Sequence, residues 1–183
     1  METSRVLEAA DMKRGERAVS ARPVDLGEAY DTYAAPLYRY LVTLVGSQED
    51  AEDALQEVFL AVGRKGLQHI RDIQPYLFQT ARRQAISLLR KRRRRAREPE
   101  VAAQLSWIDI EACRMEDRAL AIDLARALQS LPPDQREVIV LHLAEGFTFR
   151  EIASFCGIPS NTAASRYRLA LEKLRNALKG DAS

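Results

Sequence analysis

The chain has 183 residues, of which 46% are hydrophobic and 30% are charged, and its formal net charge is only +2. This length accommodates one medium or two small domains, and the apolar fraction is enough for packed cores. No segment approaches the roughly 18 apolar residues of a membrane span, and the N-terminus has no apolar export signal. Cys113 and Cys156 lack the spacing of a zinc site or a disulfide framework. We therefore expect a cytoplasmic protein with two ordinary thiols and no membrane insertion.

The charges are distributed unevenly along the chain. Residues 24–97 carry 13 basic and 9 acidic side chains, a balance of +4, whereas residues 98–114 carry four acids and one base, a balance of −3. Residues 115–183 carry nine of each sign. Within the first block the acids concentrate at 49–57 and the bases at 82–97. This polarity indicates separate surfaces for a cationic and an anionic partner.

The first half of the chain predicts three helices after a polar tail at residues 1–23. Apolar residues recur at helical spacing over 24–45, and a glycine ends this helix. A serine cap opens a second helix over 47–62, with acids in its first turns. A loop over 63–74 follows, and a proline suits the first position of a third helix over 75–95.

The second half predicts a linker and then further helices. Residues 98–114 are acidic and of mixed character, which is typical of a linker, and helical spacing returns over 116–130 and 134–145. We find no strand-like alternation longer than a few residues. The sequence therefore predicts an all-α protein with two small helical domains, at 24–97 and 115–183.

Residues 143–175 have the pattern of a helix-turn-helix motif. Thr148 and Glu151 match a capping box, Gly157 stands where a left-handed C-cap is needed, and Ser160 can cap the second helix. That second helix is long enough to lie in a major groove, and it carries side chains suited to bases and phosphates. The residues that we assign to DNA contact on it are Ser160, Asn161, Thr162, Ser165, Arg166 and Arg168.

A second basic element lies on the third predicted helix. Its nine positive charges are Arg82, Arg83, Arg90, Lys91, Arg92, Arg93, Arg94, Arg95 and Arg97. Two or three of them would complement a helix C-terminus, but nine repel one another and favour a surface that neutralises phosphates. RNA or an anionic lipid would satisfy such a tract as well as DNA. Phe78 is expected in the core, whereas Tyr76, at the start of the helix, either packs in the core as well or stacks on an opened strand.

Four polar residues of the second helix share one face, opposite its apolar stripe. They are Asp50, Asp53, Gln56 and Glu57. From the spacing alone this face is either simply solvated or the contact for a protein partner with a basic groove.

The chain shows no arrangement of residues typical of catalysis. Neither His69 nor His142 has a nucleophile or a metal ligand nearby in the sequence, and both are expected to be structural. There is no phosphate-binding glycine loop. We therefore expect a protein that is not an enzyme and that holds no cofactor or metal.

Three blocks of this sequence resemble the extracytoplasmic-function (ECF) sigma factors, compact two-domain members of the sigma-70 superfamily. DAEDALQEVFL at 50–60 is similar to the polymerase-binding helix called region 2.2. YLFQTARRQAISLLRKRRRR at 76–95 resembles regions 2.3 and 2.4, and residues 127–175 resemble region 4. Three motifs in the right order and at the right separation make the resemblance strong.

The resemblance implies a role for each element. Asp50, Asp53, Gln56 and Glu57 would meet the coiled-coil clamp of the largest subunit of core RNA polymerase. The loop over 63–74 and the third helix would recognise and melt the minus-ten element of promoter DNA and capture a flipped base. The helix from Ser160 would enter the major groove of the minus-thirty-five element, the acidic linker would run through the polymerase cleft, and an anti-sigma factor is an expected partner.

This chain departs from the family pattern at several positions. Arg83 replaces a common asparagine and Ser87 a frequent aspartate, which would alter the preference for downstream bases. Ala164 replaces a lysine in the recognition helix, and Leu169 and Leu171 replace frequent arginines. Fewer phosphate contacts would weaken upstream binding and flatten its salt dependence.

Two other classes of protein remain as alternatives. Residues 131–175 alone would also fit a helix-turn-helix regulator of the LuxR-like kind, and the basic tract alone would fit a protein that binds RNA or acidic lipid. A regulator of the first kind needs neither the acidic helix nor the basic element at 76–97.

Overall fold

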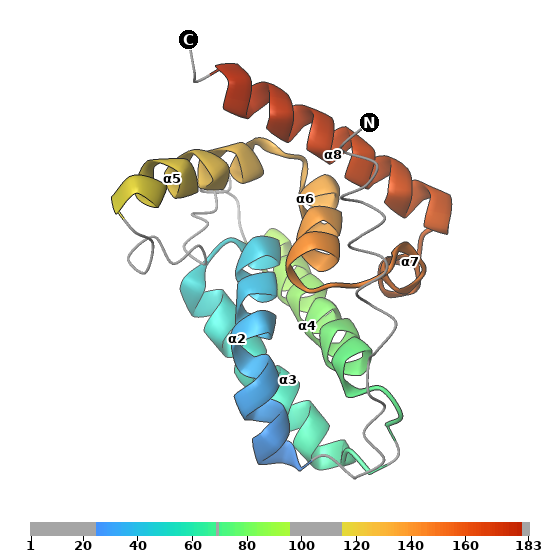
Figure 1. Cartoon of the computed structure of the whole chain (residues 1–183). Coiled ribbons are helices and arrows are strands. Elements are labelled where there is room, and N and C mark those ends of the chain that lie inside the picture. Colours follow the sequence, from blue (N-terminus) through green and yellow to red (C-terminus); the bar gives the residue numbers. More distant parts are fainter. Residues whose placement is uncertain (1–24, 69, 96–114, 181–183) are drawn as a thin grey trace.

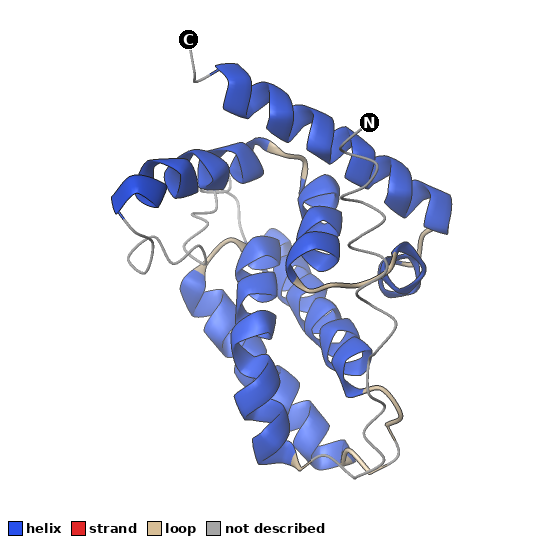
Figure 2. Cartoon of the chain, in the orientation of Figure 1, coloured by secondary structure: helices blue, strands red, loops and turns tan. Residues whose placement is uncertain are grey.

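The computed structural model describes residues 25–68, 70–95 and 115–180. Every regular element within these ranges is a helix (Figure 2). The tail at 1–23, the linker at 98–114, Cys113 and His69 all lie outside the described residues.

The helices form two groups that pack on each other (Figure 1). The N-terminal bundle consists of α2 (Leu26–Val45), α3 (Gln48–Lys65) and α4 (Ile73–Arg95). The C-terminal bundle consists of α5 (Met115–Ser130), α6 (Pro133–Ile139), the π-helical turn η1 (Val140–Ala144), α7 (Phe149–Cys156) and α8 (Ser160–Gly180). The prediction of an all-α protein is confirmed.

The loop expected over 63–74 is shorter than the sequence suggested. Helix α3 continues through Gly63 and ends at Lys65, where Gly66 adopts a positive φ of 77° and its amide donates to the Val62 carbonyl at 2.9 Å. A glycine inside a helix costs only about 1 kcal/mol, so Gly63 alone does not stop it. Helix α4 begins at Ile73, two residues before the proline that was expected to open it.

The segment expected as one helix over 134–145 is divided. Helix α6 ends at Ile139, and the chain continues as the π-helical turn η1, in which the Glu145 amide donates to the Val140 carbonyl at 3.1 Å. The Phe147 amide then donates to the Leu141 carbonyl at 2.9 Å. The wider turn brings His142 and Phe147 into buried positions.

The helix-turn-helix motif forms as its capping residues predict. The Thr148 hydroxyl accepts from the Glu151 amide at 3.3 Å, the Thr148 amide donates to the Glu151 carboxylate at 2.7 Å, and Gly157 has a left-handed φ of 66°. The second helix differs in one detail, because the amides of Thr162 and Ala163 donate to the Pro159 carbonyl. Ser160 is therefore the first residue of α8 and not its cap.

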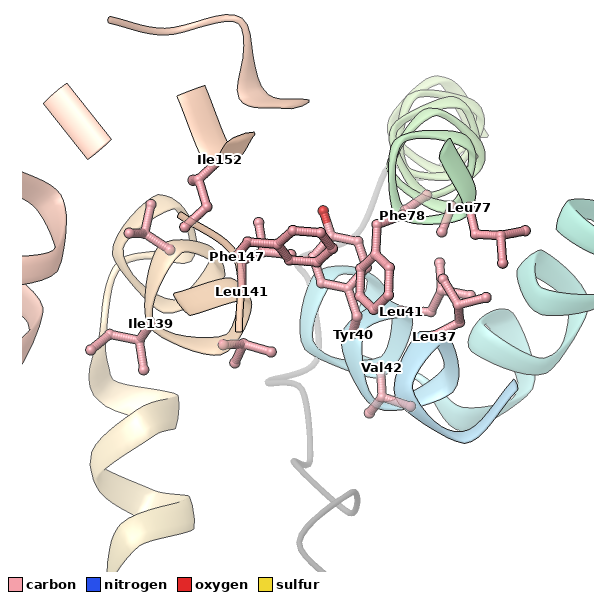
Figure 3. Close-up of a cluster of buried hydrophobic side chains, with 14 of the residues drawn as sticks. Leu37, Tyr40, Leu41, Val42, Leu77, Phe78, Ile139, Leu141, Phe147 and Ile152 are labelled. Carbon is pink, nitrogen blue, oxygen red and sulfur yellow. The ribbon is translucent and has the colours of Figure 1, made fainter. Parts of the chain in front are cut away.

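One hydrophobic core spans both bundles. Within the N-terminal bundle, Leu37 and Leu41 of α2 pack with Leu77 of α4. Phe78 of the same helix lies 4.9 Å, centroid to centroid, from the ring of Phe147 in the C-terminal bundle. Figure 3 shows the side chains of the two bundles meeting face to face along this cluster. The two domains predicted from the sequence are therefore not independent bodies in this structure.

The capping box of α7 provides a test of the local structure. We expect Thr148→Ala to lower the free energy of unfolding by about 1 kcal/mol and the melting temperature by about 2–4 °C, because the Glu151 amide loses its acceptor. Thermal denaturation followed by circular dichroism measures this change. Ser160→Ala is the matched control and should change stability by less than about 0.5 kcal/mol. Equal losses in the two variants would contradict the capping assignment.

Candidate nucleic-acid interface

The acidic face of α3 is largely open to solvent. Asp53, Gln56 and Glu57 are exposed, as the helical spacing predicts. Asp50 differs from them, because its carboxylate forms an ion pair with Arg92 of α4, with Oδ2 and Nη1 2.6 Å apart. Asp50 therefore faces the seam between α3 and α4, and Asp53 and Glu57 form no ion pair with the side chains that the structure describes.

An exposed apolar residue belongs to the same face and was missed in the sequence. Leu60 follows Gln56 and Glu57 at helical spacing and is 50% exposed. Its position continues the series 53, 56, 57, and only its apolar character sets it apart from the four polar residues predicted on this face. The face thus combines carboxylates with an apolar side chain, as the centre and rim of protein interfaces do.

The acidic face and the basic element share an edge. Asp53 and Glu57 of α3 line a groove together with Gln84, Ser87 and Lys91 of α4. The two surfaces that the charge distribution predicts are therefore neighbours, and the Asp50–Arg92 ion pair bridges them.

Four exposed bases of α4 line a second groove. Arg83, Ser87, Arg90, Lys91 and Arg94 all border it. Arg83 and Ser87, the two departures from the family pattern on this helix, thus lie side by side with the basic tract. The side chain of Arg93 is not among those that the structure describes.

Arg82 does not join these bases. Its Nε lies 2.8 Å from Glu137 Oε1 and its Nη2 lies 3.4 Å from Glu137 Oε2, across the contact between the bundles. The Tyr40 hydroxyl donates to the same Oε1 at 2.8 Å. We call these three residues the Glu137 cluster. Neither Tyr40 nor Glu137 stood out in the sequence, because each occurs in an ordinary helical pattern.

Burial and contact with Glu137 shift the pKa of Tyr40 and of Arg82. Burial, and next the charge and hydrogen bond of Glu137, raise the pKa of Tyr40 well above its usual value. Burial lowers the pKa of Arg82, but the hydrogen bond and charge of Glu137 outweigh it and raise the pKa overall. Both groups therefore stay protonated, and Glu137 has two permanent donors.

Tyr76 borders a hollow between the start of α4 and the loop before it. Lys65, Ile70 and Arg71 also line it, and Phe155 of α7 closes one side. The Lys65 ammonium lies 5.3 Å from the centre of the Tyr76 ring, within range of a cation–π contact. The hollow thus combines an aromatic face with cations, which is the chemistry that holds a single-stranded base.

The beginning of α8 presents the residues assigned to duplex contact. Ser160, Asn161 and Arg168 are exposed. Thr162, Ser165 and Arg166 are half-buried, and the Ser165 hydroxyl donates to the Thr162 carbonyl at 3.0 Å. All six lie on one helix, within three turns of its start.

One candidate DNA contact is already paired. The Arg166 Nη2 lies 3.0 Å from Asp134 Oδ2 of α6. An ion pair of this kind orients the guanidinium and also offsets its charge. Asp134, which the sequence did not indicate, therefore holds Arg166 in place.

Aromatic packing holds α8 against η1 and α7. The His142 ring stacks on Phe149 with centroids 4.3 Å apart, and it meets Tyr167 of α8 edge-on at 4.7 Å. Its Nδ1 lies 2.8 Å from the Phe147 carbonyl. His142 is a structural residue, as predicted.

None of the described helices combines the length and the apolar character needed to cross a membrane.

Comparison with protein families matches the two bundles separately. The family described as Sigma-70 region 2 matches residues 29–95, and the family described as Sigma-70, region 4 matches residues 121–174. The N-terminal bundle is thus region 2, the C-terminal bundle is region 4, and the class of protein is a sigma-70 family sigma factor.

Curated relatives narrow this class. The ECF RNA polymerase sigma factor SigL of Mycobacterium tuberculosis is 30% identical over 179 residues, which cover 92% of this chain and 97% of SigL. The ECF sigma factor SigE of Mycolicibacterium smegmatis is 32% identical over 155 residues, covering 80% of this chain and 58% of SigE. The chain belongs to the ECF sigma factors, which are non-enzymatic subunits that bind core RNA polymerase and DNA to initiate transcription.

Solved structures share the fold. A sigma factor RpoE from Bartonella quintana, in complex with the anti-sigma factor NepR, has a TM-score of 0.65 at 23% identity, covering 84% of this chain and 96% of that chain. CnrH, in complex with the cytosolic domain of CnrY, has a TM-score of 0.60 at 22% identity, and the match covers 97% of this chain and 97% of CnrH.

These comparisons decide between the alternatives left by the sequence. A LuxR-like regulator would account for the region 4 match alone, and a protein that binds RNA or lipid would account for neither match. Region 2 covers both the acidic face and the basic element, so both belong to a sigma factor.

The thiol of Cys156 provides a pH-dependent test. Burial, together with Glu137, raises the pKa of Cys156 to about 12. Because only the thiolate reacts, we expect alkylation of folded Cys113→Ser protein at pH 8 to be at least about 100-fold slower than alkylation of the unfolded chain, whose thiol has a pKa of about 8.5. The folded rate should rise about tenfold per pH unit from 8 to 10. Iodoacetamide labelling followed by mass spectrometry measures it, and equal folded and unfolded rates at pH 8 would contradict the burial of this thiol.

Proposed function

We propose that this sigma factor binds core polymerase through the exposed face of α3 and contacts promoter DNA through α4 and α8. The observation that carries this proposal is the placement of an exposed acidic face and an exposed basic groove on adjacent helices of one bundle. Such a bundle can hold a basic protein surface and the DNA backbone at the same time.

The polymerase contact centres on Asp53, Gln56, Glu57 and Leu60. The partner is the coiled-coil clamp of the largest subunit, as the family resemblance implies. Leu60 supplies apolar area at the centre of the contact, and the carboxylates supply charge complementarity, which sets specificity and association rate. Asp50 acts indirectly, through its ion pair with Arg92.

The minus-ten element is opened and held by the groove and the hollow along α4. Arg83, Arg90, Lys91 and Arg94 neutralise the phosphates of the strand, and the Tyr76 hollow receives an unstacked base. Extruding a base costs a few kcal/mol, and stacking on an aromatic ring offsets about 1–3 kcal/mol of this.

The minus-thirty-five element is read by the start of α8. Ser160 and Asn161 reach base edges or phosphates, and Arg168 meets the backbone. Leu169, where an arginine is frequent in the family, is 48% exposed and offers no phosphate contact. We therefore propose that this factor depends less on upstream phosphates than relatives that keep the arginine.

The protein works in the cytoplasm, where core polymerase resides, and an anti-sigma factor holds it inactive. The two solved structures of similar fold, which are complexes with NepR and with CnrY, support this partner.

Charge reversal on α3 tests the polymerase contact. We expect Asp53→Lys with Glu57→Lys to abolish binding to core polymerase, because two lysines would face a basic surface. The measurement is co-purification with tagged core enzyme. Asp31→Lys with Asp123→Lys is the matched control, since it makes the same change in net charge on other helices and should retain binding. Intact binding by the α3 variant would contradict the assignment of this face.

Removal of two arginines tests the upstream contact. We expect Arg166→Ala with Arg168→Ala to reduce promoter-dependent run-off transcription and to lower the salt slope of promoter binding by about 2, while core binding is retained. Arg126→Ala with Lys173→Ala removes the same charge from α5 and from the later turns of α8, away from its start, and should leave both quantities near wild type. Transcription equal to wild type in the Arg166→Ala, Arg168→Ala variant would show that the start of α8 is not the upstream reader.

A further inference from the structure

We propose that Asp134 of α6 is a positioning residue for upstream promoter recognition. It holds the Arg166 guanidinium so that this side chain reads a guanine in the major groove and does not settle on the DNA backbone. Asp134 thus sets which base is preferred, and its removal does not weaken DNA binding as such. This inference rests on the proposed role of the start of α8, and it concerns contacts within region 4 alone.

The start of α6 is a firm support for the Asp134 carboxylate. Pro133 directly precedes this residue, and the proline ring fixes its own backbone φ angle. The Arg136 guanidinium donates to the Gln129 carbonyl at 2.8 Å and to the Leu131 carbonyl at 3.0 Å, which ties this turn to the end of α5. Asp134 is therefore carried by an anchored helix and not by a loop.

Helix α8 brings Arg166 to this support. Helices α6 and α8 pack against each other (Figure 1), and the Arg166 Nη2 lies 3.0 Å from Asp134 Oδ2. The Arg166 side chain is 28% exposed and the Asp134 side chain is 48% exposed, so the pair lies at the surface, where DNA can reach it. An ion pair this exposed contributes little to folding stability, and the orientation of the guanidinium is its main consequence.

The paired guanidinium keeps the hydrogen-bonding capacity that a base requires. Arginine has five N–H donors in a planar fork. The ion pair with Asp134 is made through Nη2, so it occupies one edge of the fork and leaves another edge for DNA. One edge is enough for the two-bond contact with O6 and N7 of guanine, the commonest specific contact of arginine in the major groove. Because the carboxylate offsets the charge, attraction to a phosphate is reduced while the directional contact remains.

Arg168 provides the comparison on the same helix. It is exposed, and it forms no ion pair with any side chain that the structure describes. A phosphate offers several oxygens and accepts a mobile cation, whereas reading a base edge requires donors in a fixed geometry. Arg166, which is held, is therefore the base reader of the two, and Arg168 serves the backbone.

The outer surface of α8 gives the Asp134–Arg166 pair more weight. Leu169 is 48% exposed and Ala164 is half-buried, and at both positions the family resemblance predicts a cation. Fewer cations along the helix make fewer phosphate contacts, so base contacts carry a larger share of upstream recognition. The orientation of one reading arginine then matters more than it would on a more basic helix.

The position of Asp134 also has a local effect on α6. The residue lies in the first turn, where a carboxylate stabilises the helix through its dipole. Loss of that contribution would lower stability and would weaken transcription from every promoter alike. Loss of the ion pair would instead change the preference at one base pair, so the two effects can be told apart.

Single-round run-off transcription by the reconstituted holoenzyme measures the preference. The templates carry each of the four bases at each position of the minus-thirty-five element. A two-bond arginine contact discriminates against a wrong base by about 5- to 150-fold. We expect Asp134→Asn to lower the preference for guanine at one position about three- to tenfold, because the side chain is no longer pre-oriented. Preferences at the other positions should stay within about twofold of wild type.

The salt dependence of promoter binding is the second readout. Asp134→Asn removes a negative charge beside the duplex and lets Arg166 move to a phosphate, so the slope of log affinity against log salt should become steeper by about 1. Templates with a wrong base should be transcribed at least as well as by wild type. Loss of activity on all templates alike, with a slope that is unchanged or shallower, would describe a loosened helix and would overturn the inference.

Asp123→Asn is the matched control. Asp123 pairs with Arg126 on α5, with Oδ1 and Nη1 3.6 Å apart, so the change removes the same charge and the partner of another arginine in region 4. Its base preferences and salt slope should stay near wild type. Asp134→Glu keeps the carboxylate and should restore most of the guanine preference. Thermal denaturation followed by circular dichroism establishes that every variant is folded.

Arg166→Ala separates this inference from the proposed function. In that background Asp134→Asn should have no further effect on base preference, since Asp134 acts through Arg166. If Arg166→Ala abolishes a preference that Asp134→Asn leaves intact, the positioning role is overturned and the proposed upstream contact stands. If Arg166→Ala leaves every preference unchanged, the assignment of Arg166 to DNA is overturned as well. A lost preference for a base other than guanine would overturn the choice of base.

Discussion

The two halves of this protein meet through buried carboxylates of the C-terminal bundle, and of these Glu137 makes the shortest contacts to the N-terminal bundle. Glu137 of α6 lies between a phenol of α2 and a guanidinium of α4, and both donate to it. The interior of a protein tolerates a charge only where its hydrogen-bonding capacity is filled by the right donors. The arrangement of region 4 on region 2 is therefore held by this group, by the Arg39–Glu145 ion pair and by apolar contacts such as Phe78 with Phe147.

Helix α4 connects this contact to the chemistry of the protein. Its periodicity places Phe78 in the core, Arg82 at the interface between the bundles, and Arg83, Arg90 and Arg94 in the open groove. The core, the interface and the groove therefore share one rigid element. The adjoining acidic face of α3 places the proposed polymerase contact on the same bundle.

The local features of the fold could be predicted because they depend on near neighbours in the chain. The capping box of Thr148 and Glu151 and the left-handed Gly157 are consequences of backbone hydrogen bonding within one turn. Three other details of the local structure were predicted wrongly. Gly63 lies inside a helix that packing sustains. The segment after Ile139 widens into a π-helical turn, so that Phe147 reaches the core. At the start of α8 the Pro159 carbonyl accepts the first amides of the helix, so Ser160 does not cap it as expected.

The sequence by itself determined the all-α class, the two sigma regions, and the acidic and basic faces, because helical periodicity and charge order are properties of consecutive residues. Only the tertiary structure decided that Asp50 pairs with Arg92, that Arg166 pairs with Asp134, and that Arg82 turns away from the groove. These pairs join side chains from different helices, up to 55 positions apart. Electrostatic pairing depends on distance in space and on local burial, and neither can be read from the order of residues along the chain.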